Sequence, residues 1–556
     1  MKFSEIQYER PNIDALVAEY DALIEKIDNA ASAKEQLDCV MQHEKLFSNV
    51  MTMVAYVYIC HSVDTRDAFY EKEQEFLDEN GPLFQEKLQG LYAALLKSKF
   101  RPELEESLGK LFFLNMEIAN KTFTPENIPL MQEEAKLTTE YSKLLASASM
   151  EFDGETVNLT QLRKYEESKD RDVRRRAYAA EASFFKAHEA EFDRIFDQLV
   201  ALRNQMARNM GYENFIELGY YRMNRNCYDA GMVAVYREQV VKDILPTVVK
   251  LKEKQAKRNG LSELMFYDNA CMYPEGNPKP QAGFDEMLEL GRKMYHEMSP
   301  ETAEFIDYMI DNELFDPIAK AGKQPGGYCT YLPDYKLPFI FANFNGTSAD
   351  VDVLTHEAGH AYQAYRARNM EIQELSQATL EACEVHSMSM EFFCYPYLEL
   401  FYGDDADRAR EAHLTDAVSF LPYGCMVDEF QHIIYENPQL SPDERKAAWA
   451  KLEEKYRPFL RFEGDFFGEG MWFMRQSHIY KDPFYYIDYC LAQTAALQFW
   501  AWAQKDRDAA FAAYNALVEK AGTETFLELV TGAGLRSPFT EGCLEDVAKE
   551  VEKNLL

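Results

Sequence analysis

The chain has 556 residues, with 59 lysine or arginine and 94 aspartate or glutamate residues, so its formal net charge is −35. This excess of negative charge argues against a nucleic-acid-binding protein, because phosphate groups are neutralised by lysine and arginine. The hydrophobic content of 47% is normal for a globular protein with a large core.

The chain shows no run of about 18 apolar residues, and its first residues lack the apolar segment of a signal peptide. We therefore expect neither a membrane span nor a membrane partner. The ten cysteines are scattered and form no C-x-x-C pair. This usage is typical of free thiols in a reducing compartment, so we expect a cytoplasmic protein.

The first part of the chain is predicted to be helical, because apolar residues recur at helical spacing. The predicted helices cover residues 12–30, 34–60, 66–97, 101–120 and 130–149. Asp153-Gly154, between two short β-prone runs, predicts a tight hairpin near 150–160. Helical patterning returns from residue 170 to 260.

The pattern changes in the middle of the chain. A proline- and glycine-rich connection covers residues 273–283, and the segment 325–346 combines paired glycines, prolines and the β-prone run 339–344. This pattern predicts a small sheet that leads directly into the helix containing residues 352–365. Long helices are predicted again after residue 365.

That helix carries the pattern His356-Glu357-Ala358-Gly359-His360. Residues i and i+4 share one face of a helix, so both histidines can bind one metal ion, and Glu357 beside them can accept a proton from water. A histidine pair on an apolar helix face is, however, more often buried and hydrogen-bonded than bound to metal. A third ligand elsewhere in the chain is needed to decide.

A catalytic zinc site takes three protein ligands. The downstream segment 378–393 offers four candidates, which are Glu381, Glu384, His386 and Glu391. The three glutamates share one helix face. His386 lies about 200° around the helix from Glu384, so these two cannot bind the same ion.

The sequence HEAGHAYQAY, followed by Glu384-Val385-His386-Ser387, resembles the thimet-oligopeptidase-like zinc peptidase family, in particular its oligoendopeptidase F and Pz-peptidase branch. The resemblance is strongest over residues 320–500. It implies one Zn2+ per chain, bound by His356, His360 and Glu384. Glu381 is then expected to orient a ligand histidine or the water, although an exposed helix acid is the alternative.

The segment HIYKDPFYYIDY contains His478, Tyr485, Tyr486 and Tyr489. The resemblance implies that the late histidine and several tyrosines close over the substrate and stabilise the oxyanion. Where animal members of the family carry a glycine-rich loop, this chain has YKDPF, so which tyrosine donates is open. Packing in an aromatic core is the alternative for each tyrosine.

The segment FANFNG (341–346) precedes the metal-binding helix. An exposed strand here would bind an extended peptide through its backbone, with Ala342, Asn343 and Phe344 at the substrate. An ordinary internal strand is the alternative. The neighbouring Gly326, Gly327 and Tyr328 are expected to form a flexible loop against the substrate.

The resemblance implies a mainly α fold, with two helical lobes that enclose a deep substrate channel. We expect an N-terminal lobe over residues 1–190 and a catalytic region over 191–556, with the lobes interleaved. The predicted function is a zinc-dependent oligoendopeptidase for short, unstructured peptides. Carboxypeptidase or peptidyl-dipeptidase activity on the same zinc core is the alternative, and a non-catalytic peptide-binding scaffold is a further one.

Overall fold

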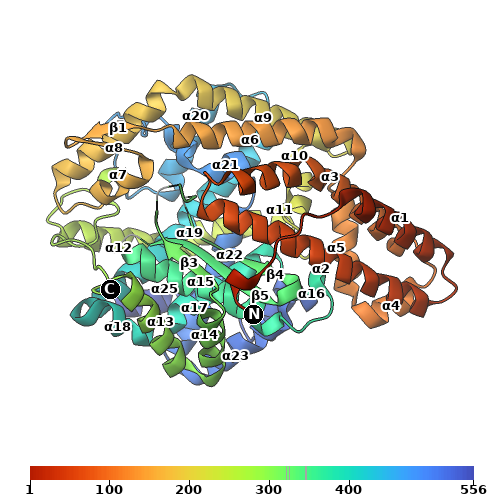
Figure 1. Cartoon of the computed structure of the whole chain (residues 1–556). Coiled ribbons are helices and arrows are strands. Elements are labelled where there is room, and N and C mark those ends of the chain that lie inside the picture. Colours follow the sequence, from red (N-terminus) through yellow and green to blue (C-terminus); the bar gives the residue numbers. More distant parts are fainter. Residues whose placement is uncertain (321, 325, 345–346) are drawn as a thin grey trace. The chain divides into compact units, whose positions relative to one another are not determined.

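The computed structural model describes residues 1–320, 322–324, 326–344 and 347–556. It is mainly helical with two small sheets, as the sequence predicts (Figure 1). The α-helices are α1 (Ile13–Asn29), α2 (Ala33–Val63), α3 (Ala68–Leu96), α4 (Arg101–Leu108), α5 (Lys110–Asn120), α6 (Ile128–Ala146), α7 (Leu159–Glu166), α8 (Arg171–Ala187), α9 (Glu189–Asn209), α10 (Phe215–Arg222), α11 (Ala230–Gln239), α12 (Leu245–Arg258), α13 (Phe284–Met298), α14 (Pro300–Asp311), α15 (Ser348–Ala367), α16 (Gln373–Ser376), α17 (Leu380–Phe393), α18 (Glu399–Tyr402), α19 (Ala406–Glu436), α20 (Pro442–Tyr456), α21 (Ser477–Lys481), α22 (Tyr486–Ala503), α23 (Arg507–Lys520), α24 (Phe526–Gly532) and α25 (Cys543–Leu555). The strands are β1 (Met150–Phe152), β2 (Glu155–Val157), β3 (Phe315–Ile318), β4 (Tyr328–Leu332) and β5 (Leu337–Phe344).

The helices belong to two compact units, each built from three separate segments. The first unit contains Met1–Asn120, Lys279–Ala406 and Ala495–Arg536. The second contains Lys121–Pro278, Asp407–Thr494 and Ser537–Leu556. The domain boundary near residue 190 stays a prediction from the sequence.

Helices α1, α2 and α3 pack together at the start of the first unit. Their shared core includes Leu16, Tyr20 and Leu23 of α1 and Val40 of α2. By length and composition alone, α2 is apolar enough to cross a membrane, with a mean hydropathy of 1.4 over an 18-residue window. It also packs against β4, and its buried residues include polar ones, so it serves as a core helix of this unit.

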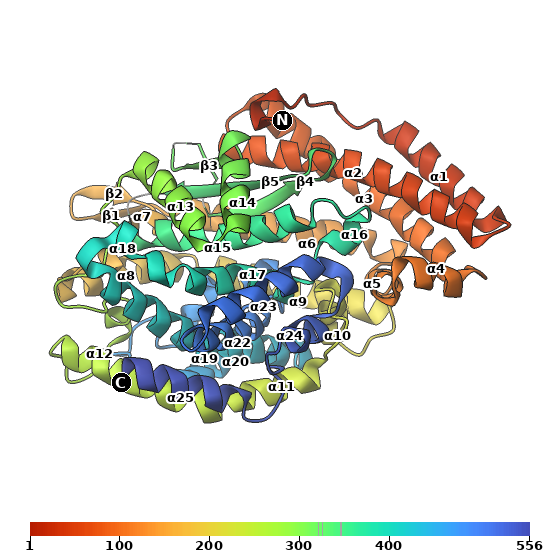
Figure 2. The same cartoon turned by 90° about the horizontal axis from the view of Figure 1, so that it is seen from below.

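The three-stranded sheet of the first unit has the order β3-β5-β4, with β3 parallel and β4 antiparallel to β5. β5 is therefore the central strand, and all but one of its side chains are buried. Pairing on both sides is limited to Ile340 and Phe341, because the β4 register ends at Phe341 and only β3 continues to Phe344. The exposed edge expected at residues 341–344 therefore stays a prediction. Residues 345–346 of that segment lie outside the described residues. Helix α15 packs against β5 and against α17 (Figure 2).

The second unit contains the hairpin predicted from Asp153-Gly154. β1 and β2 pair antiparallel across these two residues, which both have positive φ, 49° and 84°. A two-residue turn with positive φ matches the twist of the strands it joins. In the same unit, α6 and α9 lie side by side (Figure 1).

Candidate active site

Helix α15 brings His356 and His360 onto one face, one turn apart. Their ring centroids are 5.1 Å apart. Their side chains keep relative exposures of 24% and 20%, so both rings remain reachable from outside the core. Glu357, next to His356, is buried.

Helix α17 supplies the third polar group. Glu384 Oε2 lies 3.3 Å from His356 Nε2 and 3.6 Å from His360 Nε2. The three ligand atoms all lie within 4.8 Å of one another. Two helices separated in sequence thus bring two imidazoles and one carboxylate to a single point.

The close approach of α15 and α17 depends on Gly359. A Cβ atom at this position would lie 2.6 Å from the carbonyl oxygen of His386 and 2.6 Å from the Cα of Ser387. Only glycine fits such a contact without moving one helix. The glycine inside the H-E-x-x-H pattern therefore sets the distance between the two ligand-bearing helices.

His386 does not join this cluster. Burial lowers the pKa of His386 to about 3, so the ring is neutral. Its ring nitrogens hydrogen-bond to no residue that the structure describes, while its backbone carbonyl accepts a hydrogen bond from Tyr514. His386 is thus part of the core behind the site, consistent with its predicted place on the helix.

Two further side chains of α17 orient the cluster. The Ser387 hydroxyl donates to Glu384 Oε2 at 3.0 Å, which gives the E-x-x-S spacing a physical reason. Glu391 Oε1 lies 2.6 Å from His356 Nδ1 and so fixes the orientation of that ring. The sequence predicts Glu391 only as a candidate third ligand and predicts the orienting role for Glu381, which is fully buried in the structure. Helix periodicity places both acids on one face and could not separate them.

The charges of the cluster affect one another. Burial opposes protonation of His356, but hydrogen bonds and charges from Glu384 and Glu391 raise its pKa well above the usual value. Burial raises the pKa of Glu357 to about 7. Burial lowers the pKa of His360 to about 4, which leaves this imidazole neutral and able to bind a metal.

The predicted glycine loop lies beside Glu357. A Cβ on Gly327 would lie 3.5 Å from Glu357 Oε1, and Tyr328 stacks on Phe341 at 4.8 Å between ring centroids. Asn343 Nδ2 donates to the carbonyl oxygens of Gln324 and Gly326 at 2.8 and 2.7 Å. Asn343 therefore anchors this loop. Ala342 and Phe344 are buried.

His478, Tyr485, Tyr486 and Tyr489 lie in the second unit and gather there. The His478 ring centroid is 5.8 Å from that of Tyr485, 5.0 Å from that of Tyr486 and 5.9 Å from that of Tyr489. Gln476 Nε2 lies 2.8 Å from His478 Nδ1. All four side chains are partly exposed. The predicted constellation is thus a local cluster within its unit.

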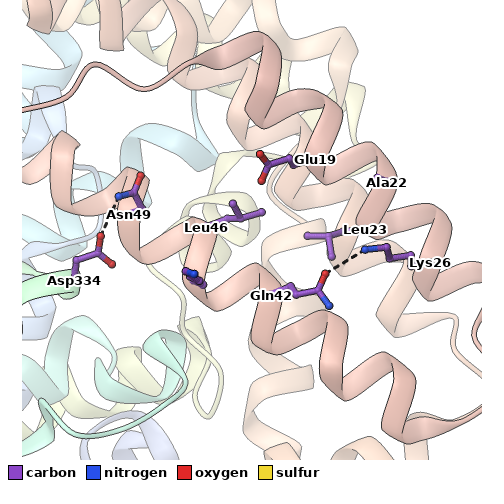
Figure 3. Close-up of a pocket in the computed structure, with 9 residues that line it drawn as sticks. Glu19, Ala22, Leu23, Lys26, Gln42, Leu46, Asn49 and Asp334 are labelled. Atoms are coloured by element: carbon purple, nitrogen blue, oxygen red, sulfur yellow. Dashed lines mark hydrogen bonds between the residues drawn. The ribbon is translucent and has the colours of Figure 1, made fainter.

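A hollow of about 480 Å³ lies between α1 and α2 (Figure 3). Four of its polar side chains form two hydrogen-bonded pairs, Asn49 with Asp334 at 3.1 Å and Lys26 with Gln42 at 3.2 Å. None of the predicted catalytic or metal-binding residues lines it. The hollow is therefore separate from the histidine–glutamate cluster.

Comparisons with known proteins identify the family of this chain. Residues 3–123 match the peptidase M3 N-terminal domain, and residues 164–549 match peptidase family M3. Group B oligopeptidase PepB of Streptococcus agalactiae serotype III (strain NEM316) is 24% identical over 79% of this chain and 76% of its own length. The oligoendopeptidase F homolog of Lactococcus lactis subsp. lactis (strain IL1403) is 22% identical over 87% of this chain and 82% of its own length.

Among solved structures, Pz peptidase A with an inhibitor superposes with a TM-score of 0.96. It is 48% identical and covers 100% of this chain and 99% of its own. This match extends over both compact units. Together with the family model, which covers more than half of the sequence, it shows that the chain belongs to peptidase family M3 and is a metallopeptidase of the oligopeptidase type.

Proposed function

We propose that this chain is a zinc-dependent oligoendopeptidase that cuts internal bonds of short, unstructured peptides. The observation that carries the proposal is the convergence of His356, His360 and Glu384 beside Glu357 in a chain of family M3. In a tetrahedral zinc site with bonds of about 2.1 Å, neighbouring ligand atoms lie about 3.4 Å apart. The separations of 3.3 and 3.6 Å from Glu384 Oε2 to the two histidines fit this value.

Two nitrogens and one carboxylate are the donor set of catalytic zinc sites in peptidases. When bound, zinc supplies Lewis acidity that polarises the scissile carbonyl and activates water. Glu384 and the two histidines hold the ion, Ser387 orients the carboxylate, and Glu391 orients the His356 ring. The second ring nitrogen of a metal-binding histidine typically donates to a carboxylate, a backbone carbonyl or water. Glu381 stays a predicted second acid of this group.

Glu357 is proposed as the general base. It accepts a proton from the attacking water and returns it to the leaving amine nitrogen. Burial raises its pKa to about 7, close to the operating pH at which a base is most effective. Its Oε1 faces the Gly327 loop, where the absence of a side chain leaves room for a substrate backbone.

An extended peptide can add to the sheet at β4, because β4 pairs only with β5 among the described strands. Gly327 and Tyr328 stand at the start of this strand and remain proposed substrate contacts. Ala342, Asn343 and Phe344 stay proposed contacts as well, and the Asn343 side chain also holds the glycine loop. His478 and the tyrosines 485, 486 and 489 are proposed to donate to the oxyanion.

The decisive variant is Glu357→Gln, which removes the base and keeps all three metal ligands. It should retain one zinc per chain and bind peptide, while turnover falls to near the background rate. Internally quenched peptides with blocked ends report endopeptidase cleavage, and mass spectrometry of the products separates it from carboxypeptidase or peptidyl-dipeptidase action. Near wild-type turnover by Glu357→Gln would refute the mechanism.

The size limit is a separate part of the proposal and rests on the resemblance to oligopeptidases. Flexible peptides should be cut, and a native folded protein should survive the same incubation. A cytoplasmic location belongs to the proposal too, and it is supported by ten cysteines that are all free thiols.

A further inference from the structure

A second cluster of metal-ligating side chains lies in the first unit, outside the site already described. It contains His43 and Glu44 of α2 and Glu374 of α16. His43 Nε2 lies 3.0 Å from Glu374 Oε1 and 4.0 Å from Glu44 Oε1. One ligand atom from each residue lies within 4.8 Å of the others.

The cluster lies inside an apolar core. His43 is 0% exposed and Glu44 is 4% exposed, and Tyr20 and Ile372 belong to the surrounding hydrophobic cluster. Gln42 and Lys45, the neighbours along α2, line the hollow of Figure 3, whereas His43 and Glu44 do not. A buried carboxylate in such surroundings needs a partner to offset the loss of water.

Both carboxylates have an oxygen without a donor. No N–H or hydroxyl group in the part of the chain that the structure describes donates to Glu44 Oε1 or Glu374 Oε2, although the two carboxyl groups share a hydrogen bond with each other. This Glu44 oxygen is the one that lies near His43 Nε2. Buried polar atoms of this kind are rare in proteins and indicate a proton, water or ion shared within the cluster.

Two of the three side chains are held by an atom that points away from the cluster. The Tyr20 hydroxyl lies 2.9 Å from His43 Nδ1, and the Gln373 backbone N–H donates to Glu44 Oε2 at 2.7 Å. The Tyr92 hydroxyl donates at 3.3 Å to Glu374 Oε1, the oxygen that also faces His43 Nε2. Hydrogen bonds to the outer atoms of His43 and Glu44 are of the kind that orients metal ligands.

We propose that His43, Glu44 and Glu374 form a second metal site, which takes a divalent transition-metal ion such as Zn2+ or Mn2+. One imidazole and two carboxylates suit these ions, because imidazole disfavours Mg2+ and Ca2+ and the set contains no thiolate. His43 and Glu44 are buried and the Glu374 side chain is 20% exposed, so little room is left for a substrate, and we assign the site a structural role.

The position of Glu374 in α16 indicates that a bound ion would stabilise the connection between α15 and α17. Helix α16 stands in the connection between α15 and α17, the two helices that carry the active-site ligands. Gln363 of α15 also holds α16, because its Nε2 donates to the Ser376 carbonyl at 2.9 Å. An ion at the cluster would tie α2 to this connection across 331 residues of sequence.

A shared proton is the rival explanation. Burial and the neighbouring Glu374 raise the pKa of Glu44 to about 10, so Glu44 holds a proton when no cation is bound. Glutamine has the shape of a protonated glutamate. Glu44→Gln should therefore fold normally under either explanation, and it separates them because an amide is a poor metal ligand.

The test measures metal content in the full chain with the active-site metal removed by His356→Ala/His360→Ala. After dialysis against Zn2+ and Mn2+ and then against buffer, plasma mass spectrometry should find about one ion per chain. Adding Glu44→Gln or Glu374→Gln should lower this at least ~10-fold, since each removes a ligand. Glu19→Gln, an exposed acid of α1, is the matched control and should leave the metal content unchanged.

A crystal of the wild-type chain grown with Mn2+ provides a direct measurement. An anomalous difference peak should lie between His43 Nε2 and the two carboxylates. Metal content that Glu44→Gln leaves unchanged, or no peak at this position, would overturn the proposal in favour of the shared proton. The zinc of the active site is counted separately, as the difference between wild type and the double histidine variant, so failure of the proposed function would be recognised on its own.

Discussion

Gly359 lies against the backbone of His386, where a Cβ atom would approach the His386 carbonyl oxygen to 2.6 Å. The contact joins the helix that carries both ligand histidines to the helix that carries Glu384. The ligand distances therefore depend on a residue that binds nothing itself.

Gly359→Ala should lower both stability and metal affinity. Alanine ordinarily stabilises a helix interior by about 1 kcal/mol relative to glycine, but here it forces the two helices apart, which costs about 1–3 kcal/mol. The displaced Glu384 should weaken zinc binding by ~10-fold or more. Thermal unfolding and a zinc titration with a competing chelator measure the two effects.

Gly532→Ala is the control for that variant. Gly532 ends α24, and its added Cβ would meet only the flexible ends of two side chains, Lys520 Nζ at 3.1 Å and Glu524 Oε2 at 3.8 Å. It should leave zinc affinity and stability close to wild type. A Gly359→Ala variant that behaved like Gly532→Ala would show that the helix contact does not set the ligand geometry.

Ser387→Ala removes the hydroxyl that donates to Glu384 Oε2 at 3.0 Å. Because the carboxylate is then free to turn away from the histidines, zinc affinity should fall ~10–100-fold. Ser389 is the matched control, since it is also fully buried on α17 and its hydroxyl bonds to none of the described residues. Ser389→Ala should keep wild-type affinity in the same chelator titration. Equal affinities for the two variants would contradict the orienting role of Ser387.

The roles of Glu391 and Glu381 can be separated by matched amide variants. Glu391→Gln replaces the charged partner of His356 Nδ1, so zinc affinity should fall ~10–100-fold. Glu381→Gln should have the smaller effect. The comparison requires only apparent zinc affinities and a circular dichroism spectrum to confirm folding. The opposite order would return the orienting role to Glu381, as the sequence first indicated.

Local signals account for the features that the sequence predicted correctly. The hairpin follows from Asp153-Gly154, whose residues tolerate positive φ, and the paired histidines follow from the i, i+4 geometry of one helix. Both depend on residues within a few positions of each other. The same holds for the mainly helical fold, which periodicity indicates segment by segment.

Features that depend on contacts between distant segments could not be predicted in this way. The central place of β5 in its sheet could not be predicted, because nothing in its own residues shows that β3 and β4 pair on opposite sides of it. Glu391 shares a helix face with Glu381. Only the packing of α17 against α15 shows that Glu391, of these two, contacts His356. The contact between His43 and Glu374 spans 331 residues and had no local signal at all.

The second unit should lose stability in acid because of His432. Burial lowers the pKa of His432 to about 4, although the charge of Asp428 opposes this shift and those of Arg237 and Arg225 support it. The unfolded chain, with its ordinary pKa of 6.5, binds a proton first as pH falls. The free energy of unfolding is therefore highest above pH 6.5. It falls as the pH drops from 6.5 to 4, and the loss due to His432 is about 3 kcal/mol at pH 4.

His432→Gln tests this assignment. The Tyr220 hydroxyl lies 3.1 Å from His432 Nε2, and glutamine keeps a polar partner for it. Glutamine cannot be protonated as the pH falls. The unfolding temperature of the variant should fall less steeply than that of wild type between pH 7 and pH 5. Parallel curves for the two proteins would show that other groups cause the acid sensitivity.

The final prediction concerns His478 and its tyrosines. Attack on a peptide carbonyl creates a negative oxygen, and a neighbouring N–H or O–H strengthens its hydrogen bond only as that charge develops. Such a donor raises kcat more than it lowers KM. Burial raises the pKa of Tyr486 well above its usual value, so this residue keeps its proton and can donate.

If His478 donates to the oxyanion, His478→Ala should lower kcat by ~10²–10³-fold, while zinc content stays at the wild-type level. Tyr485→Phe, Tyr486→Phe and Tyr489→Phe each remove one hydroxyl and keep the ring, and at least one should lower kcat with little change in KM. Tyr480→Phe is the matched control, because Tyr480 is fully buried, stacks on Tyr141 at 4.1 Å and donates to no described residue. Its kcat should equal that of wild type. If the four variants at 478, 485, 486 and 489 also keep wild-type kcat, the cluster is ordinary aromatic packing. The donors to the oxyanion would then have to lie elsewhere in the chain.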